Sequence, residues 1–173
     1  MSRVVCAVLL SSCMATSQAA PLGLGDVPSA ASVAARDDAI GPRGDELPAG
    51  HGDAVAGALV YAQQCAACHG AHGHEGPDPV LVGGQGSLAG EHPLATVGSY
   101  WPYATTVFDY IRRAMPFTAP GSLSTDEAYA VTAFVLHANG IIGQHDVMDR
   151  EQLPRVRMPN RDGFIADPRP AGL

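Results

Sequence analysis

The chain has 173 residues, of which 46% are hydrophobic and 16% are charged, a length and composition that suit one small domain with flanking segments. The formal net charge is −7 and every strongly basic residue is arginine, which argues against nucleic-acid binding because that function usually needs a basic patch. Four cysteines are too few for a disulfide-stabilised scaffold.

The beginning of the chain, residues 1–20, has the layout of a secretory signal peptide. Arg3 precedes an apolar stretch that is too short to span a bilayer, and small residues follow at the expected cleavage point. No later segment is long and apolar enough to cross a membrane, so we expect a periplasmic protein that has lost Cys6 and Cys13 with the signal. In an alternative, Leu-Ser-Ser-Cys at 10–13 is a lipoprotein signal and Cys13 carries a lipid anchor.

The next segment, residues 21–52, is rich in Ala, Gly, Pro and Asp and contains few large apolar side chains. Such a segment cannot bury enough apolar surface to order itself. We therefore expect a flexible linker here.

Three helices are predicted after this segment. The first spans residues 53–64 and runs directly into the sequence CAACHG. Asp53 suits its N-cap, and Val55, Leu59 and Ala62 recur at the spacing of one helix face.

The other two helices follow a loop rich in Gly, Pro and His. Residues 104–114 have an amphipathic pattern that predicts a helix ended by Pro116. The last helix begins after Ser124, which forms a capping box with Glu127, and it stops at Gly140.

These helices, with no convincing strand, predict a small all-α domain over residues 53–142. Residues 143–173 are polar and rich in Arg and Pro, so we expect an extended C-terminal extension. A domain of this size has a thin core, which a large, covalently held apolar group would complete.

The hexapeptide CAACHG carries the chemistry. Cys65 and Cys68 could form a redox dithiol, half of a zinc site or the anchor of a haem. A redox dithiol is expected after a strand, and a zinc site would need His72 and His74 to complete four ligands. A helix precedes the hexapeptide, no second CxxC exists, and a haem needs only the two thiols and an adjacent histidine, His69. The sequence therefore predicts one covalent haem c with His69 as an axial ligand.

The second axial position of the iron needs another ligand. Met115 lies in RAMPF at the end of the second helix, 46 residues beyond His69, which is enough chain to cross from one haem face to the other. Met158 also precedes a proline but lies in the polar extension. The remaining candidates are Met148 and the histidines His51, His72, His74, His92, His137 and His145. We expect Met115 because of this position. A thioether ligand closes the coordination sphere, which suits transfer of single electrons.

The order of helix, CAACHG, loop, RAMPF and capped C-terminal helix resembles that of class I cytochromes c. The resemblance implies three main helices around one haem, with the first and last crossing at Gly57, Tyr61 and Phe134. It also implies that a proline carbonyl, that of Pro79 or otherwise Pro77, holds the Nδ1–H of the proximal histidine.

Two longer strings, VGSYWPYATTVFDYIRRAMPF and LPRVRMPNRDGF, resemble the cytochrome subunits of periplasmic sulfur and sulfite dehydrogenases. In those systems a molybdenum-cofactor subunit oxidises the sulfur compound and passes electrons to the cytochrome. The larger of these cytochromes carries two haems, whereas this chain has one CxxCH and matches a single haem domain. Trp101 and Tyr103 are candidates to line the haem pocket, and Arg112 and Arg113 could pair with haem propionates or with a partner, or face solvent.

Together these observations predict a mono-haem c-type cytochrome that transfers electrons and is not itself an enzyme. The resemblance implies a molybdoenzyme dehydrogenase as electron donor and another cytochrome or a terminal oxidase as acceptor. Two alternatives remain: a haem-based sensor or peroxidase-like protein in which Met115 is displaced, and a structural subunit whose haem is not reduced in turnover.

Overall fold

The computed structural model describes residues 24–34, 36–166 and 168. The expected signal peptide, with Cys6 and Cys13, lies outside the described residues. The chain divides after Arg36 into two units. The described part of the first unit contains one short helix, α1 (Ala30–Ala34), whose residues are all exposed.

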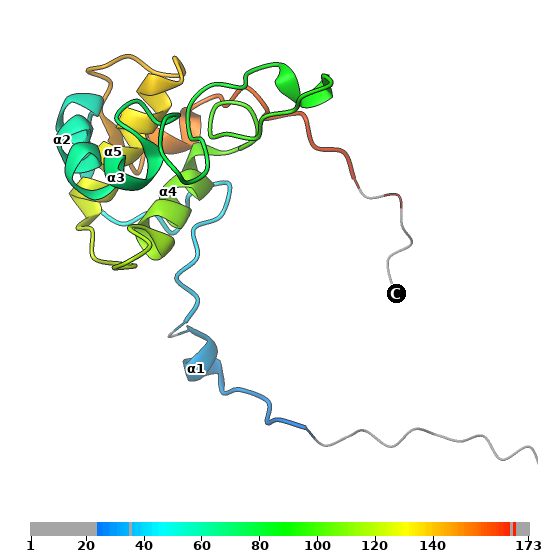
Figure 1. Cartoon of the computed structure of the whole chain (residues 1–173). Helices are drawn as coiled ribbons and strands as arrows, with labels where there is room; N and C mark the ends of the chain where they lie inside the picture. Colours follow the sequence, from blue (N-terminus) through cyan, green and yellow to red (C-terminus); the bar gives the residue numbers. More distant parts are fainter. Residues whose placement is uncertain (1–23, 35, 167, 169–173) are drawn as a thin grey trace, which may run out of the picture. The chain divides into compact units, whose positions relative to one another are not determined.

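The second unit contains the three predicted helices, α2 (Ala54–Gln64), α4 (Ala104–Ala114) and α5 (Thr125–Ala138), within one residue of the expected bounds (Figure 1). A four-residue helix, α3 (Ala66–His69), follows α2, and two 3₁₀ turns span Ser87–Ala89 and Leu153–Arg155. Two short strands, β1 (His51–Gly52) and β2 (Met148–Asp149), pair antiparallel. Among the described residues, no helix has the length and apolar character needed to cross a membrane.

Helices α2 and α5 cross at Gly57, as the resemblance implies. A Cβ atom at this position would lie 1.9 Å from the carbonyl oxygen of Ala130, so only glycine allows the two backbones to approach this closely. One turn further along, the rings of Tyr61 and Phe134 pack with centroids 4.6 Å apart. The crossing therefore holds the part of α2 that leads into the CAACHG segment against the last helix.

The face of α2 that packs inward differs from the one predicted. Ala54, Gly57 and Tyr61 are buried, whereas Val55 is 42% exposed and Leu59 is 68% exposed. The physical reason is the close crossing, which admits small side chains and excludes branched ones at the contact. Val55 and Leu59 therefore do not mark the buried face, whereas Tyr61, one turn beyond the crossing, is buried against Phe134.

The ends of the helices follow the predicted capping chemistry. The Asp53 carboxylate accepts a hydrogen bond from the N–H of Ala56 at 2.8 Å, and Ser124 and Glu127 form the expected capping box. Gly140 has a φ of +69°, which suits the turn that ends α5. In the core, Phe108 of α4 packs on Tyr129 of α5 with ring centroids 4.3 Å apart.

The expected linker is partly wrong, because residues 37–52 belong to the folded unit. Ile40 and Leu47 are 3% and 4% exposed and pack in the main core. The N–H of Ile40 donates to Oδ1 of Asp109 at 2.9 Å, and the hydroxyl of Tyr129 donates to the carbonyl of Pro48 at 3.0 Å. Hydrogen bonds to side chains of α4 and α5 hold the backbone of this segment. It is therefore ordered although it contains few large apolar side chains.

The arginines of α4 take part in the same contacts. Arg113 forms an ion pair with the buried Asp109 on the same helix, and Arg112 donates to the carbonyl of Asp38 at 3.3 Å. Burial raises the pKa of Asp109, but the hydrogen bonds from Arg113 and Ile40 outweigh it, so the pKa lies below its usual value of 3.8. Neither arginine is simply a solvated side chain, and both contacts lie inside this unit.

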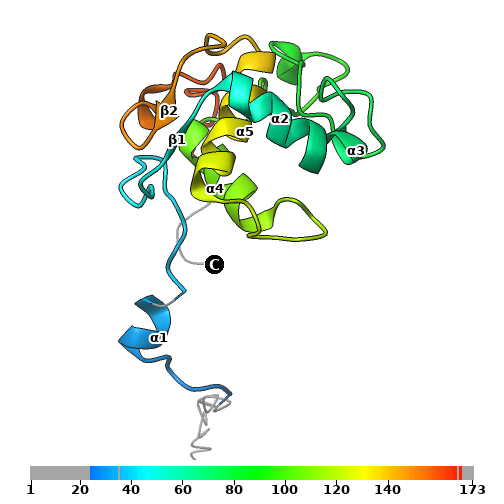
Figure 2. The ribbon, with the colours of Figure 1, turned by 90° about the vertical axis from the view of Figure 1, so that its left-hand side faces the viewer.

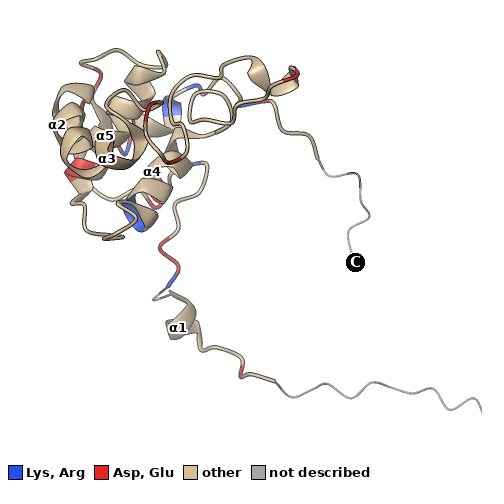
Figure 3. Ribbon diagram, in the orientation of Figure 1, with Lys and Arg blue, Asp and Glu red and all other residues tan. Residues whose placement is uncertain are grey.

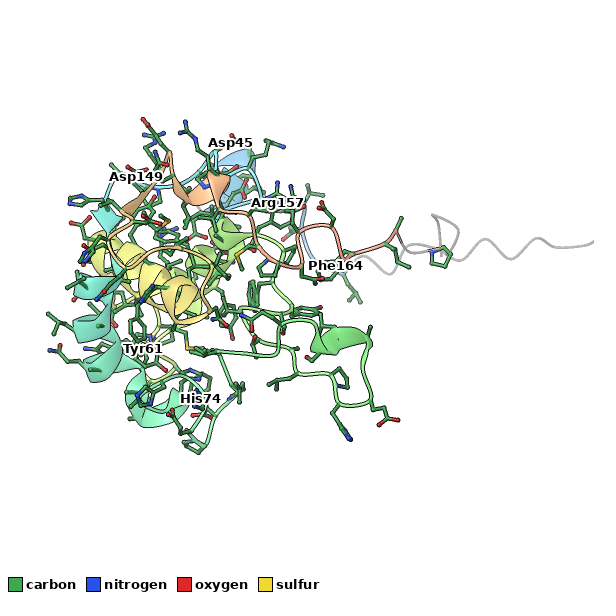
Figure 4. The ribbon with its side chains drawn as sticks, turned by 90° about the horizontal axis from the view of Figure 1, so that it is seen from above. Asp45, Tyr61, His74, Asp149, Arg157 and Phe164 are labelled. Carbon is green, nitrogen blue, oxygen red and sulfur yellow. The ribbon has the colours of Figure 1, made fainter. Side chains whose placement is uncertain are left out.

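The C-terminal extension also differs from expectation, because much of it packs on the helices. Leu153 and Met158 are 0% and 1% exposed. Further on, Asn160 donates to the carbonyl of Tyr100 at 2.8 Å, and Phe164 (labelled in Figure 4) meets the Tyr100 ring edge-on at 5.3 Å. The two strings that carry the narrower resemblance, SYWPY and RMPNRDGF, are therefore in direct contact.

Candidate functional site

The cysteines and histidine of CAACHG lie on one helical turn at the end of α2. The N–H of Cys65 donates to the carbonyl of Tyr61 at 2.9 Å, and that of His69 donates to the carbonyl of Cys65 at 3.0 Å. Cys65 is half-buried and Cys68 is exposed, and both are free thiols. The turn thus presents two unpaired sulfurs and an imidazole within five residues.

Both thiols have raised pKa values. Burial raises the pKa of Cys65 to about 11, and a hydrogen bond with Asp78 raises the pKa of Cys68 above its usual value. Reactive redox cysteines instead have lowered pKa values, since the thiolate is the nucleophile. The electrostatics therefore disfavour the redox dithiol.

The zinc alternative also lacks support. His72 and His74 are exposed, and Nδ1 of His72 lies 2.5 Å from Oε1 of Glu75, so these side chains interact with one another on the loop that follows α3 (Figure 4). The hydrogen bond from the backbone of His72 is the main cause that lowers the pKa of Glu75 to about 2. Within the described part of the chain, no three His, Cys, Asp or Glu side chains form a group that could hold a metal ion.

His69 has its orientation fixed by a backbone carbonyl. Its Nδ1 lies 2.9 Å from the carbonyl oxygen of Pro79, the residue preferred over Pro77. Because a carbonyl only accepts, Nδ1 carries the proton, and in the neutral ring this tautomer leaves the lone pair on Nε2. A neutral imidazole with a free Nε2, beside two unpaired thiols, is the donor set that a covalently attached haem requires.

The loop after the hexapeptide is held by Tyr61 of α2. Its hydroxyl donates to the carbonyl of Gly70 at 2.9 Å, and burial raises its pKa to about 12, so the phenol keeps its proton at any physiological pH. Gly70 has a φ of +82°, which lets the chain turn away from α3. Tyr61 thus joins the helix crossing to the loop that leads to Pro79.

Met115 occupies the C-cap of α4, where its N–H donates to the carbonyl of Ile111 at 3.1 Å. Figure 2 shows α3 and the segment that follows α4 on the same side of α5. Met115 is half-buried, whereas Met158 is 1% exposed and belongs to the main core. That difference favours a ligand role for Met115 and a packing role for Met158, and both assignments stay predictions.

The two aromatic candidates, Trp101 and Tyr103, lie in different surroundings. The Trp101 ring packs on Tyr110 of α4 with centroids 5.7 Å apart. Tyr103 is the N-cap residue of α4, and the guanidinium of Arg161 lies 4.3 Å above its ring, a cation–π contact. Trp101 therefore lies against α4, whereas one face of Tyr103 is covered by Arg161.

Sequence reasoning missed two buried polar residues that organise this region, Asp109 and Asn139, which are 7% and 8% exposed. In the sequence pattern, Asp109 is one more polar residue of an amphipathic helix, and Asn139 indicates only where α5 ends. Their partners are 69 and 56 residues away in the chain, at Ile40 and Gly83. A local pattern contains no signal for such pairs.

Comparisons with known proteins identify the domain. A family model described as cytochrome C oxidase, cbb3-type, subunit III matches residues 52–135. A chain in the crystal structure of the sulfane dehydrogenase SoxCD from Paracoccus pantotrophus is 44% identical, with a TM-score of 0.74. That match covers 86% of this chain and 73% of the other chain. The curated proteins give no match.

These matches agree with the geometry of the site. The matched residues 52–135 include α2, the CAACHG turn, Pro79 and Met115. The family points to haem electron transfer, and the similarity to SoxCD supports the resemblance to the cytochromes of sulfur-compound dehydrogenases. The chain belongs to the cytochrome c family.

Proposed function

We propose that this protein is a mono-haem c-type cytochrome that carries single electrons in the periplasm and accepts them from a molybdenum-cofactor dehydrogenase of sulfite or another sulfur compound. The observation that carries the proposal is the hydrogen bond between His69 and Pro79 beside the two free thiols of Cys65 and Cys68. When bound, haem c supplies a one-electron couple.

The residues of the chain have separate roles in this proposal. Cys65 and Cys68 anchor the porphyrin through thioether bonds, and His69 offers Nε2 to the iron. Met115 offers its sulfur as the other axial ligand, which favours the reduced state. Trp101 and Tyr103 line the pocket, with Trp101 held against Tyr110.

The surface that leads into α4 suits association with a redox partner. Between residues 79 and 108 the sequence has one charged residue, Glu91, and Figure 3 shows this part of the ribbon almost free of acidic and basic colouring. Transient redox complexes need small, readily separated contacts. Charged residues also reach this region from the C-terminal segment, where Arg161 lies over Tyr103. A contact with the remaining surface avoids the cost of desolvating charges.

The proposed donor is supported by the similarity to SoxCD, which is named as a sulfane dehydrogenase, and by the two strings in contact at Tyr100. The protein acts as an electron-transfer protein, alone or as the cytochrome subunit of such a complex. Its acceptor is another cytochrome or a terminal oxidase.

Haem attachment and ligation are tested on the full chain produced in a bacterium that matures c-type cytochromes. We expect haem that stays with the polypeptide after denaturation, and its loss in a Cys65→Ser, Cys68→Ser double variant. The reduced protein should have a low-spin spectrum that carbon monoxide leaves unchanged. Rapid carbon monoxide binding would instead support the sensor or peroxidase-like alternative.

The donor is tested by rapid mixing with a sulfite-oxidising or sulfane-oxidising molybdoenzyme and its substrate. We expect reduction of the haem, followed by its oxidation when a terminal oxidase is added. A haem that stays oxidised in the presence of active dehydrogenase and substrate would contradict the proposed donor. The spectra of the preceding experiment would be unaffected, so the two parts of the proposal fail separately.

A further inference from the structure

The segment that follows Pro79 is fastened to the end of α5 by one side chain, that of Asn139. Its Oδ1 accepts a hydrogen bond from the N–H of Gly83 at 2.9 Å, and its Nδ2 donates to the carbonyl of Leu81 at 3.1 Å. The same Nδ2 donates to the carbonyl of Val135 at 2.9 Å, one turn back on α5. The amide group thus joins two points of the loop to the helix.

The same segment is also tied to the loop that follows CAACHG. The N–H groups of Leu81 and Val82 both donate to the carbonyl of Gly73, at 2.8 and 3.2 Å. Pro79 lies between this attachment and His69. Its carbonyl therefore faces His69 from a segment that Gly73 and Asn139 both hold on the C-terminal side of Pro79. On the N-terminal side, the N–H of Asp78 donates to the carbonyl of Cys68 at 3.0 Å.

The surroundings leave Asn139 little freedom to move. It is 8% exposed, and a Cβ atom on Gly98 would lie 2.1 Å from its Oδ1. Its backbone carbonyl also accepts from Nε2 of Gln85 at 2.9 Å. An amide is the side chain that can accept from Gly83 and donate to two carbonyls at this length, since a carboxylate has no donor and an aliphatic group has neither.

We propose that Asn139 is a positioning residue, which holds the Leu81–Gly83 segment so that the Pro79 carbonyl stays 2.9 Å from Nδ1 of His69. This inference rests on the proposed function, because it assigns Asn139 a role in orienting the axial histidine. A firm acceptor on Nδ1 makes the imidazole a more basic ligand. A more basic imidazole stabilises oxidised iron, so loosening the segment raises the reduction potential.

The test uses Asn139→Leu, a neutral variant of similar volume that loses all three side-chain hydrogen bonds, and Asn139→Ser as a milder second variant. NMR of the reduced holoprotein measures hydrogen exchange at the Gly83 amide and at the Nδ1 proton of His69. We expect exchange at both sites to be about tenfold faster, since leaving a buried hydrogen-bonding group unsatisfied costs about that factor in stability. A redox titration should give a higher midpoint potential.

Two controls separate positioning from general loss of stability. Thr132→Val removes a buried hydrogen bond of the same helix, from Oγ1 to the carbonyl of Ala128 at 2.6 Å, and Leu153→Ala opens the core away from this loop. Both controls should leave the Nδ1 exchange and the potential at wild-type values.

Three results would overturn the inference. One is an unchanged Nδ1 exchange rate and potential in both Asn139 variants while the Gly83 amide exchanges faster. Another is an equal shift in the controls. A wild-type protein that attaches no haem would remove the proposed function itself, and this inference with it, and the denatured-protein assay identifies that case independently.

Discussion

The crossing of α2 and α5 at Gly57 predicts an unusual response to a change from glycine to alanine. In an exposed helix this change stabilises by about 1 kcal/mol, because alanine has the higher helix propensity. At Gly57 the new Cβ would lie 1.9 Å from the carbonyl oxygen of Ala130, a backbone atom that cannot rotate away. The helices must separate by about 1 Å, at an overpacking cost of about 3 kcal/mol. We expect Gly57→Ala to destabilise the folded protein by about 2 kcal/mol.

The assay is urea unfolding of the holoprotein, followed by far-ultraviolet circular dichroism and by haem absorbance. Ala62→Gly on the exposed side of α2 is the matched control, and its loss should be about 1 kcal/mol, from propensity alone. Because the Tyr61–Phe134 contact lies one turn from the crossing, the haem signal should change together with the helix signal. A Gly57→Ala variant as stable as the wild type would refute the close-crossing argument.

Three further predictions follow from the site and its supports. Met115→Ala should abolish the far-red thioether-to-iron band of the oxidised protein. Met158→Ala should retain that band but destabilise the protein by about 2–5 kcal/mol, because it truncates a core side chain. The reverse spectra would exchange the two roles. The pKa of Asp109 is lowered, so its contribution to stability is complete above the unfolded pKa near 3.8 and is lost as the pH falls through the lower folded pKa. The free energy of unfolding should therefore fall less steeply with acid in Asp109→Asn than in the wild type. Parallel curves of unfolding free energy against pH would contradict this. Arg161→Ala should remove the cation–π contact with Tyr103 and lower stability by about 0.5–1 kcal/mol in thermal unfolding, with Arg157→Ala as the exposed control that stays within error.

The features predicted well from the sequence are those that a short stretch determines. The Asp53 cap, the Ser124–Glu127 capping box and the Gly140 stop each depend on residues within four positions of one another. The His69–Pro79 hydrogen bond was instead implied by the resemblance to class I cytochromes c, and no local pattern predicts it.

The features that were missed depend on partners distant in the chain. The buried face of α2 was misjudged because Ala130 of α5 selects small residues there, over Val55 and Leu59. The composition of residues 37–52 predicts a linker, because nothing local indicates that the backbone N–H of Ile40 forms a hydrogen bond with Asp109. The roles of Asn139 and of the C-terminal segment were hidden for the same reason.

The internal pairing of α4 has a consequence for how the protein meets its partners. Arg113 is paired with Asp109 and Arg112 with Asp38, so the positive charges of this helix are matched within the domain. Charges that are already matched contribute little long-range attraction, and added salt has little left to screen. The two arginines of α4 should therefore contribute little to the ionic-strength dependence of encounter with a partner, which the net charge of −7 on the whole chain sets instead.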